Sequence, residues 1–503
     1  MNVTECIQQD YMEWQRGDII TISAGTGKGK SHFVKNKLYD HAKSKGKRIL
    51  FFLHRTNTIE QFEAEIVAEG KSDVIDLITY QSFEKAIIHQ NQIDLWMYEF
   101  IICDEYHYFG NDSSFNKYTD LSLNEIIEGA DERVVVLMSA TNEFIKGYLS
   151  EHKSLEPKEY IVPSNYDYIK TLEFFDDEQY IIEGLEKFKS EGKKAIIFID
   201  SANECYDLYK QFKDVSMFIC GKSHSKYKYV DKEKRHQLLR NQRFDDLFLF
   251  ATQTLDAGVN IIDPELNIVI ADIADPDVLV QCVGRKRITN EGDFIHLIVK
   301  NRNNYSLGRA KSDLTECMKH YKFLQVHDVK TYQREFYRTP DISQLVYFEP
   351  LPNGLYELKM NELLYESFRY RYRNITKIQE MPGGYRQFIV ELFDKQRSIY
   401  HDSYLEPETI VALEKAFAKE VTFFTQGEKS GFAAQLNLKS NGRLIKSFKK
   451  INEQLTLKEA SYRILKFDTK RDGKRYKTAW RVIEMPKCVD KNDVIVNIEG
   501  QQI

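Results

Sequence analysis

The sequence has few cysteines and no cysteine pair at the spacing of a metal or redox motif. Its 503 residues include seven cysteines, and no Cys-x-x-Cys pair occurs among them. An odd number of scattered thiols argues against a disulfide framework and against a clustered zinc site, and it indicates reduced cysteines in a cytosol. The sequence also lacks residue patterns typical of a nuclease or a protease.

Long apolar runs and net positive charge are also absent. No run approaches the roughly 20 apolar residues that a membrane span needs, and the N-terminal stretch has no basic region followed by an apolar core. We therefore expect neither a membrane span nor a signal peptide. The formal net charge is −5, so any basic surface for nucleic acid must be local. The length predicts about three domains.

A glycine-rich turn between an apolar run and a helix start is the most informative stretch present. The strand-like run Ile19–Ile22 leads into AGTGKGKS at 24–31, with Ala24 at the place of the usual first glycine. The glycines that would let backbone N–H groups point at phosphate oxygens are Gly25, Gly27 and Gly29. Lys30 would reach the β- and γ-phosphates of a nucleotide, and Ser31 would hold Mg²⁺. A flexible basic turn is the alternative interpretation.

Two adjacent acids follow a later apolar run. Short apolar runs alternate with helical ones from residue 19 to 138, which predicts a parallel sheet covered on both faces. Phe100–Cys103 ends in Asp104 and Glu105, so both carboxylates should lie at the C-terminal edge of that sheet, where ligands bind. Asp104 suits Mg²⁺, and Glu105 suits the base that orients an attacking water. An ordinary acidic loop is the alternative.

These motifs resemble those of superfamily 2 helicases of the DExH type. AGTGKGKS, DEYH at 104–107 and SAT at 139–141 occur in the order of helicase motifs I, II and III. The resemblance implies that His107 links the ATP site to motif III, although a core histidine is the alternative. It also implies that Ser139 and Thr141 couple the nucleotide state to the strand-binding cleft. A finer likeness is to DEAD/DEAH-box proteins of bacteria and their mobile elements.

Two further segments of the first domain resemble nucleic-acid contact motifs of that family. HRT at 54–56 is similar to motif Ia, and TYQSF at 79–83 is similar to the next contact segment. The resemblance implies contacts to the sugar-phosphate backbone from Arg55, Thr79 and Ser82.

The motif order continues in a second alternating block. Glu156–Ser164 carries two prolines and is predicted to be the linker. ATQTLDAGVNI at 251–261 resembles motif V, and QCVGRKR at 281–287 resembles motif VI. By that resemblance Asp256 and Gln281 contact the nucleotide and Thr252 contacts nucleic acid, while Gly258 and Asn260 also match motif V positions. Arg285 and Arg287 would reach the γ-phosphate across the interdomain cleft, which suits a guanidinium. A plain basic turn is the alternative for GRKR.

The last third of the chain resembles no family that we identify, but it concentrates charge. Lys439–Arg481 holds fourteen basic residues against four acidic ones, with interleaved aromatics. Arg471, Lys474 and Arg475 flank an Asp-Gly turn in a predicted hairpin, which suits phosphate contact and base stacking. A solvated basic face or a surface for an acidic protein is the alternative. Residues 365–377 are predicted to be helical or mixed. Within them, FRYRYR at 368–373 is interpreted as a second basic stripe on a strand, or as a buried aromatic strand. Glu406–Thr425 is predicted to be a helix.

The sequence therefore predicts an α/β protein with two tandem RecA-like P-loop domains, at 1–160 and 165–303, and an α+β C-terminal region at 304–503. The expected activity is that of a cytoplasmic, ATP- and Mg²⁺-dependent helicase that moves along one strand of nucleic acid, with DNA preferred over RNA. A translocase or remodeller that does not unwind is one alternative. A nucleotide-gated scaffold that recruits a protein partner through its C-terminal region is the other.

Overall fold

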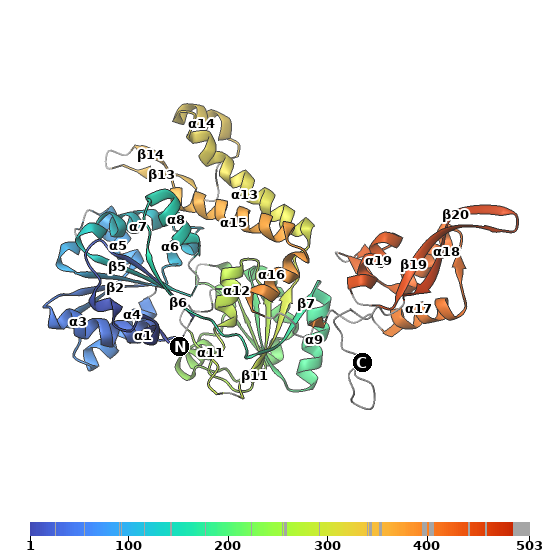
Figure 1. The fold of residues 1–503 in the computed structure, drawn as a ribbon, viewed down its shortest axis with the longest axis horizontal. Helices are drawn as coiled ribbons and strands as arrows, with labels where there is room; N and C mark the ends of the chain where they lie inside the picture. The colour runs from blue at the N-terminus through green and yellow to red at the C-terminus, as the bar shows by residue number, and fades with distance from the viewer. Residues whose placement is uncertain are drawn as a thin grey trace, which may run out of the picture. The chain divides into compact units, whose positions relative to one another are not determined.

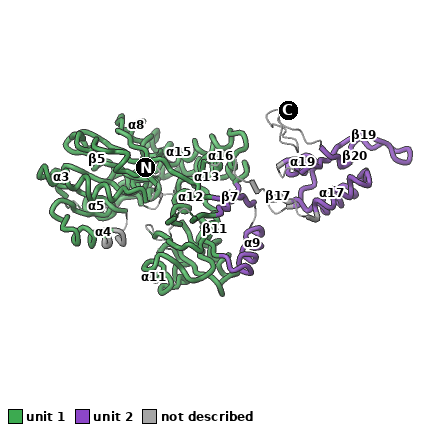
Figure 2. Tube along the Cα trace, turned by 60° about the horizontal axis from the view of Figure 1, so that its bottom comes forward, with its two compact units in different colours: residues 1–169, 194–295, 302–396 green, residues 170–193, 296–301, 397–503 purple. Residues whose placement is uncertain are grey.

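The computed structural model describes residues 1–485 apart from a set of short gaps. The gaps are residues 26, 55, 90, 92, 115, 141–142, 177, 223, 254, 256–258, 291, 340, 342–344, 352–354, 395–399, 402–406, 441–442 and 458–459. The chain divides into two compact units, of which the first comprises 1–169, 194–295 and 302–396 (Figure 2). In the part of the chain that the structure describes, no helix is long and apolar enough to cross a membrane.

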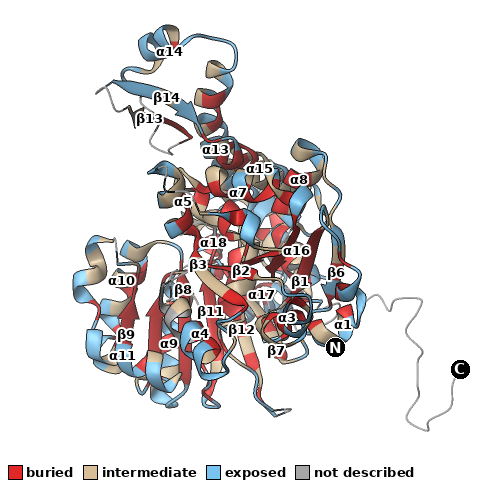
Figure 3. Cartoon of the chain, turned by 90° about the vertical axis from the view of Figure 1, so that its left-hand side faces the viewer, coloured by how far each residue is buried: buried red, intermediate tan, exposed pale blue. Residues whose placement is uncertain are grey.

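The N-terminal part of the first unit is a six-stranded sheet whose neighbouring strands are all parallel (Figure 1). Its strands, in the order β3-β2-β4-β5-β1-β6, are β1 (Ile19–Ala24), β2 (Ile49–Leu53), β3 (Ile75–Thr79), β4 (Phe100–Asp104), β5 (Val134–Ser139) and β6 (Lys158–Val162). Strands β2, β4 and β5 are buried along their whole length, as in a sheet covered on both faces. Figure 3 colours buried residues red, and many of them lie on strands.

Helices cover both faces of this sheet because alternate strand residues feed two separate cores. Ile20 and Ile22 pack into one core with Phe33 of α2, whereas Ile19 packs into the other with Tyr80 of α5. The helices and 3-10 turns are α1 (Val3–Ile7), η1 (Asp10–Met12), α2 (Lys30–Phe33), α3 (Tyr39–Ser44), α4 (Thr56–Ala68), α5 (Tyr80–Ile88), η3 (Leu95–Met97), α6 (Tyr108–Asn111), η4 (Asp112–Ser114), α7 (Thr119–Glu128), η5 (Ala130–Glu132) and α8 (Glu143–Lys153).

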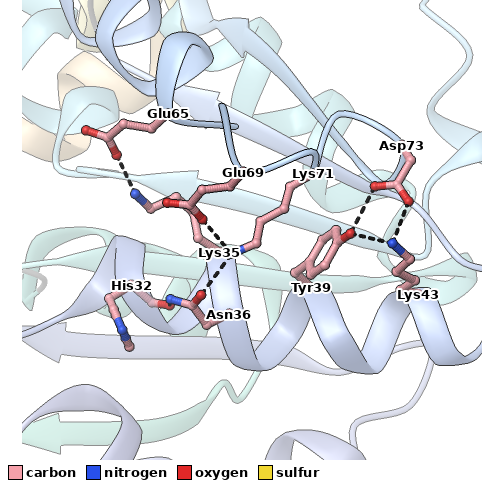
Figure 4. A network of polar contacts seen from close by, with 9 residues as sticks. All are labelled: His32, Lys35, Asn36, Tyr39, Lys43, Glu65, Glu69, Lys71 and Asp73. Carbon is pink, nitrogen blue, oxygen red and sulfur yellow. Dashed lines mark hydrogen bonds and ion pairs between the residues drawn. The ribbon is translucent and has the colours of Figure 1, made fainter. Parts of the chain in front are cut away.

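The helix behind the phosphate loop contains a π segment. The helical stretch from residue 30 to 44 is continuous, but α2 and α3 are joined by the π-helical η2 (Val34–Leu38). A polar network covers this segment (Figure 4): Lys71 Nζ donates to Asn36 Oδ1 at 2.8 Å and pairs with Glu69 at 2.6 Å. Lys43 Nζ donates to the hydroxyl of Tyr39 at 2.8 Å. These contacts hold the wider turn in place.

The predicted linker is shorter than expected because part of it is a strand. Lys158–Val162 forms β6, which pairs with β1 at the edge of the sheet. Tyr160 and Val162 are buried while Lys158 and Ile161 are exposed, which is the alternation of an edge strand with one covered face.

The second α/β block of the first unit has four parallel strands in the order β11-β8-β10-β9. These strands are β8 (Lys194–Ile199), β9 (Ser216–Ile219), β10 (Phe248–Ala251) and β11 (Leu266–Asp272), and the helices are α10 (Ala202–Gln211), η6 (Lys213–Val215), η7 (Ser225–Tyr229), α11 (Lys232–Asn241) and α12 (Pro276–Val283). The prediction of an α/β fold with two tandem parallel-sheet domains of the RecA type is confirmed.

The first unit continues beyond residue 302 with helices and one hairpin. These elements are α13 (Asn304–Leu324), α14 (Val329–Phe336), the antiparallel pair β13 (Val346–Pro350) and β14 (Tyr356–Met360), α15 (Glu362–Glu380) and α16 (Gly384–Leu392). Both strand interpretations of FRYRYR are wrong, because residues 368–373 lie inside α15. Leu364 and Phe368, one helical turn apart, are buried together with Tyr321 of α13.

The second unit contains 170–193, 296–301 and the C-terminal region from 397. Its elements are most of β7 (Ile169–Phe175) and β12 (Ile295–Lys300), and α9 (Glu178–Ser190), β15 (Tyr400–His401), α17 (Pro407–Ala418), β16 (Thr422–Phe423), α18 (Gln426–Leu436), β17 (Lys439–Ser440), β18 (Arg443–Leu444), α19 (Phe448–Leu457), β19 (Tyr462–Arg471) and β20 (Lys474–Glu484). Strands β16, β20 and β19 form an antiparallel sheet.

Of two predictions for the C-terminal region, one is confirmed and the other is wrong in its end point. The basic hairpin is confirmed, since Asp472 and Gly473 join β19 to β20 with φ of 50° and 75°. The helix predicted over 406–425 ends earlier, at Ala418. Glu420 adopts a left-handed φ of 47°, and the Val421 N–H donates back to the Ala416 carbonyl at 2.9 Å, which is a helix cap that releases the chain into β16.

Candidate nucleotide and nucleic-acid site

The glycine-rich turn forms a loop between β1 and α2. Gly27 and Gly29 have φ of 79° and 86°, values that L side chains rarely adopt, so glycine is required at both places. Gly29 is the N-cap of α2, which begins with Lys30 and Ser31. Lys30 is 7% exposed, and its Nζ donates to the Ala24 carbonyl at 3.0 Å, so the ammonium lies under the loop.

The two acids after β4 lie against this lysine. Glu105 Oε1 is 3.6 Å from Lys30 Nζ, and Glu105 Oε2 is 3.2 Å from His107 Nδ1. Glu105 has a φ of 50°, an uncommon value for a non-glycine residue that is typical of functional constraint. Oδ1 of Asp104 is buried and has no hydrogen-bond partner.

The environment separates the pKa values of the two carboxyl groups. Burial and the neighbouring Glu105 charge raise the pKa of Asp104 to about 7. Burial also opposes ionisation of Glu105, but Lys30, His107 and Arg285 outweigh it and hold the pKa of Glu105 below its usual range. Glu105 is therefore the carboxylate that stays ionised.

Motifs II and III are joined by a direct contact. His107 Nδ1 and Ser139 Oγ share a hydrogen bond of 2.9 Å, and Ser139 is the last residue of β5. This places His107 between Glu105 and motif III, as the resemblance implied. Thr141 lies outside the described residues.

In the second domain, the backbone of motif VI runs beside motif V like a short strand, so successive side chains point to opposite sides. Lys286 bridges to Ile261 of motif V, where the Ile261 N–H donates to the Arg285 carbonyl at 2.8 Å. Lys286 Nζ is buried and contacts both carboxylate oxygens of Asp293 at 2.7 Å. Residues on either side of Lys286 consequently point away from that buried pair. Arg287 Nε donates to Asn260 Oδ1 at 2.7 Å.

Both motif VI arginines act on the first domain. A Cβ placed on Gly27 would lie 3.6 Å from Arg287 Nη1, so this guanidinium approaches the phosphate loop. The charge of Arg285 lowers the pKa of Glu105. Burial and the charge of Arg285 lower the pKa of Arg287 to about 10. Arg285 and Arg287 thus lie close enough to affect each other's charge near the phosphate loop, and a bound anion would neutralise them.

A cavity of about 330 Å³ lies between these elements, a volume within the range of ligand pockets. Gly25 and Gly27 line it from the first domain, and Gln281, Gly284 and Arg287 line it from the second. Asp256, the other predicted nucleotide contact in motif V, lies outside the described residues.

The predicted nucleic-acid contacts are spread over several places. Thr79 caps α5, and its Oγ1 accepts from the Ser82 N–H at 3.0 Å. Thr252 follows β10 and is 4% exposed, and Arg55 lies outside the described residues. The three hairpin residues lie in the second unit. Arg471 pairs with Glu428 at 3.1 Å, and Arg475 pairs with Asp468 at 2.5 Å. Lys474 Nζ lies 5.6 Å from the centre of the Tyr476 ring.

Sequence reasoning missed three contributions to this site. The Val3 N–H donates to the Lys28 carbonyl at 2.9 Å, which ties α1 to the phosphate loop. Asn260 was matched to motif V, but its contact with Arg287 was not expected. Tyr80 donates to the Asp104 carbonyl at 2.9 Å. The only sequence signal for Tyr80 was its place inside TYQSF.

Two family models match the chain. Residues 2–144 match the model described as type III restriction enzyme, res subunit, and residues 177–288 match the helicase conserved C-terminal domain. No curated protein sequence matches significantly.

Several solved structures are similar to the chain. One is "S. cerevisiae Dbp5 bound to RNA and ADP BeF3", which is 15% identical with a TM-score of 0.41 and covers 58% of this chain and 81% of its own. Another is "DEAD-box helicase Mss116 bound to ssRNA and UDP-BeF", at 13% identity and a TM-score of 0.44, covering 78% and 89%. A DEAD box protein from the hyperthermophile Methanococcus jannaschii is 16% identical, with a TM-score of 0.34 and coverage of 66% and 89%.

Proposed function

This chain belongs to superfamily 2 of the ATP-hydrolysing helicases, and from that premise we propose that it couples hydrolysis in the cavity between its two α/β domains to movement along one strand of nucleic acid. In this proposal residues 1–160 and 165–303 are the motor domains and 304–503 is an accessory region. The observation that carries the proposal is that Lys30 pairs with Glu105 and the charge of Arg285 also acts on Glu105, while Arg287 lines a cavity together with the glycine loop.

The N–H groups of the glycine loop and the ammonium of Lys30 bind the phosphates of ATP. Lys30 is already paired with Glu105, so an incoming γ-phosphate competes with that carboxylate for the same cation. Glu105 is then free to accept a hydrogen bond from the attacking water and to orient it. Arg285 and Arg287 stabilise the charge that develops on the transferred phosphoryl group.

A magnesium ion fits the residues on the first domain. Asp104 Oδ1 is a buried oxygen without a hydrogen-bond partner, and oxygen ligands of this kind are those that Mg²⁺ prefers. Asp104 and the hydroxyl of Ser31 would hold the ion, which supplies charge neutralisation to the β- and γ-phosphates.

We propose that the nucleic acid along which the protein moves is DNA. The model matched over the first domain carries the name of a restriction-enzyme subunit, and this supports DNA over RNA. The first contact surface is the start of α5 with Thr79 and Ser82, and the second is the hairpin bearing Arg471, Lys474 and Arg475. A translocase that does not separate strands would use the same site, and a strand-displacement assay distinguishes it from a helicase.

The test is ATP hydrolysis by the full chain with single-stranded DNA, duplex DNA or RNA. We expect Lys30→Ala and Glu105→Gln each to lower turnover at least ~100-fold, because one loses the phosphate cation and the other the water-orienting group. Matched controls are Lys37→Ala, at an exposed lysine of the same helical stretch, and Glu132→Gln, whose side chain is 73% exposed. Near-normal hydrolysis by both site variants would refute the assignment. Stimulation by RNA alone would overturn the DNA preference.

A further inference from the structure

We propose that Tyr80 is a positioning residue that couples the strand-contact segment 79–83 to the phosphate site by holding the peptide group between Asp104 and Glu105. Its hydroxyl donates to the Asp104 carbonyl at 2.9 Å, and that carbonyl belongs to the peptide that joins the two carboxylate residues. The inference rests on the proposed function, because it assumes that strand and nucleotide bind at the two ends of this link.

The peptide that Tyr80 holds needs external support. Its orientation sets the φ of Glu105, which at 50° lies in a region where non-glycine residues persist only when the surroundings hold them. The next peptide is also held, because the Tyr106 N–H donates to the Met138 carbonyl at 3.2 Å. Tyr80 therefore supplies one of the contacts that keep Glu105 facing Lys30.

The Tyr80 ring can transmit a displacement because it is clamped on both faces. The ring is fully buried and stacks on Tyr108 at 4.5 Å with an interplanar angle of 9°. Phe52 stacks on it at 5.4 Å, and Phe109 packs edge-on at 5.0 Å. Packed interiors of this kind transmit strain because they have no room for a compensating side-chain motion.

Tyr108 adds a second attachment to the same helix. Its hydroxyl donates to Glu84 Oε1 at 2.8 Å, and Glu84 lies one turn after Tyr80 on α5. The segment that follows the two carboxylates is thus bound to α5 through Tyr80 and through Glu84. A movement of α5 must carry the Asp104–Glu105 peptide with it or break these bonds.

The other end of the link lies at the proposed strand contact. Tyr80 directly follows Thr79, the N-cap of α5, and Ser82 is in the first turn of that nine-residue helix. Thr79 is buried and its hydroxyl donates to Ser82 Oγ at 2.7 Å, whereas Ser82 is exposed. A backbone phosphate of the strand that binds Ser82 would pull on the end of the helix that carries Tyr80. Nucleotide binding would act in the reverse direction, since coupling between two sites is reciprocal.

The ring and the hydroxyl have separable roles. A tyrosine that only fills the core would be replaced by phenylalanine with little consequence for communication between sites. The proposal requires the hydroxyl, so Tyr80→Phe tests it while retaining the stacked ring. The matched control is Tyr160→Phe on β6, which removes the hydroxyl of another buried tyrosine of the first domain, one that donates to Asp10 at 3.0 Å.

The readout is the coupling factor, the ratio of the Kd for a labelled single-stranded oligonucleotide without and with a non-hydrolysable ATP analogue. We expect about 5- to 150-fold coupling in the unsubstituted protein, a value within about twofold of unity for Tyr80→Phe, and an unchanged factor for Tyr160→Phe. Wild-type coupling in Tyr80→Phe overturns the inference, and so does an equal loss in the control.

A second variant covers a failure to fold. Phe52→Leu loosens the clamp but keeps the Tyr80 hydroxyl, so it must also lower the coupling factor, and an unchanged factor would contradict the proposed link. If the unsubstituted chain binds neither DNA nor RNA, or hydrolyses no ATP, the proposed function itself fails. Normal coupling in the unsubstituted chain and in Tyr80→Phe removes only the role of Tyr80.

Discussion

At the scale of single residues, Lys286 determines which way its neighbours face. Its side chain is 1% exposed and that of Asp293 is 2% exposed, so the two charges are buried together. Because Lys286 points into the second domain, the adjacent Arg285 and Arg287 can point out of it. Three consecutive cations thus contain one buried structural cation, Lys286, between the two arginines that are proposed to bind phosphate.

This arrangement predicts an asymmetric response to substitution. Asp293→Ala leaves the Lys286 ammonium buried without its counter-charge, and it should destabilise the second domain by about 3–5 kcal/mol. The double variant Lys286→Met with Asp293→Leu removes both charges and should be much closer to the unsubstituted protein. Thermal unfolding of the full chain, followed by fluorescence, measures both. Equal destabilisation by the two variants would contradict the role of the pair.

The residues of the site that could be predicted share one property: they lie in short motifs at strand ends. Lys30, Asp104 and Glu105 were identified in this way, and the structure places them together. The direction of Lys286 and the contact between Asn260 and Arg287 could not be predicted. Both depend on how two loops distant in sequence pair with each other, which no local pattern encodes.

At the scale of elements, the β19–β20 hairpin is the proposed nucleic-acid contact of the second unit. Its turn was predictable because Asp-Gly accepts the positive φ values that a tight hairpin needs. Its charges are partly engaged within the protein, since Arg471 and Arg475 each pair with a carboxylate. Such exposed pairs are weak, so phosphate groups of a nucleic acid could replace them.

Replacing Arg471, Lys474 and Arg475 together by alanine should weaken binding of single-stranded DNA. It should also reduce the slope of log K against log salt by ~0.7 for each phosphate group that the hairpin no longer binds. A titration at several salt concentrations measures both quantities. The comparison variant changes Lys446, Lys449 and Lys450, which are also exposed in the second unit. An equal effect from both triples would indicate a general basic face, and no effect would favour an acidic protein partner.

FRYRYR shows why an element can be misinterpreted from its pattern. Aromatic and basic residues alternate there, which is the period of a strand. The structure instead uses the helical period, burying Leu364 and Phe368 while Arg369 pairs with Glu366 on the same helix at 2.8 Å. Tyrosine and arginine both have apolar stems and polar ends, so they suit either period, and the surroundings decide.

At the scale of the whole molecule, α15 contacts both α/β domains of the first unit. Glu366 pairs with His152 of the first domain at 3.1 Å. Arg371 pairs with Asp275 of the second domain at 3.5 Å. Asp275 is the N-cap of α12, the helix that leads to the motif VI arginines. Helix α15 therefore contacts the start of α12, the helix that leads into motif VI, at a residue that does not line the cavity.

Arg371→Ala should raise the KM for ATP while changing the free energy of unfolding only slightly. The pair is partly exposed, so its loss should cost less than about 1 kcal/mol, but α12 would lose a tether to the first domain. The matched control is Arg373→Ala, whose partner Glu151 belongs to the first domain alone. Steady-state hydrolysis and thermal unfolding of both variants provide the measurement, and an equal KM shift in the control would refute the tether.

The tandem α/β architecture was predictable because each motif sits at the end of an apolar run. The inclusion of 302–396 in the first unit was not predictable. Leu363 of α15 is fully buried in the core of the first domain, more than 200 residues from the strands it covers in the sequence. Long-range burial of this kind leaves no trace in local periodicity.

The left-handed backbone of Glu105 has an evolutionary consequence. A strained residue is retained while selection for turnover outweighs the gain in stability that a relaxed residue would bring. Lineages in which hydrolysis has become dispensable should therefore drift at this position towards glycine or asparagine, which accept such a φ more readily. The residue at position 105 would then distinguish relatives that still hydrolyse ATP from relatives that have lost this activity.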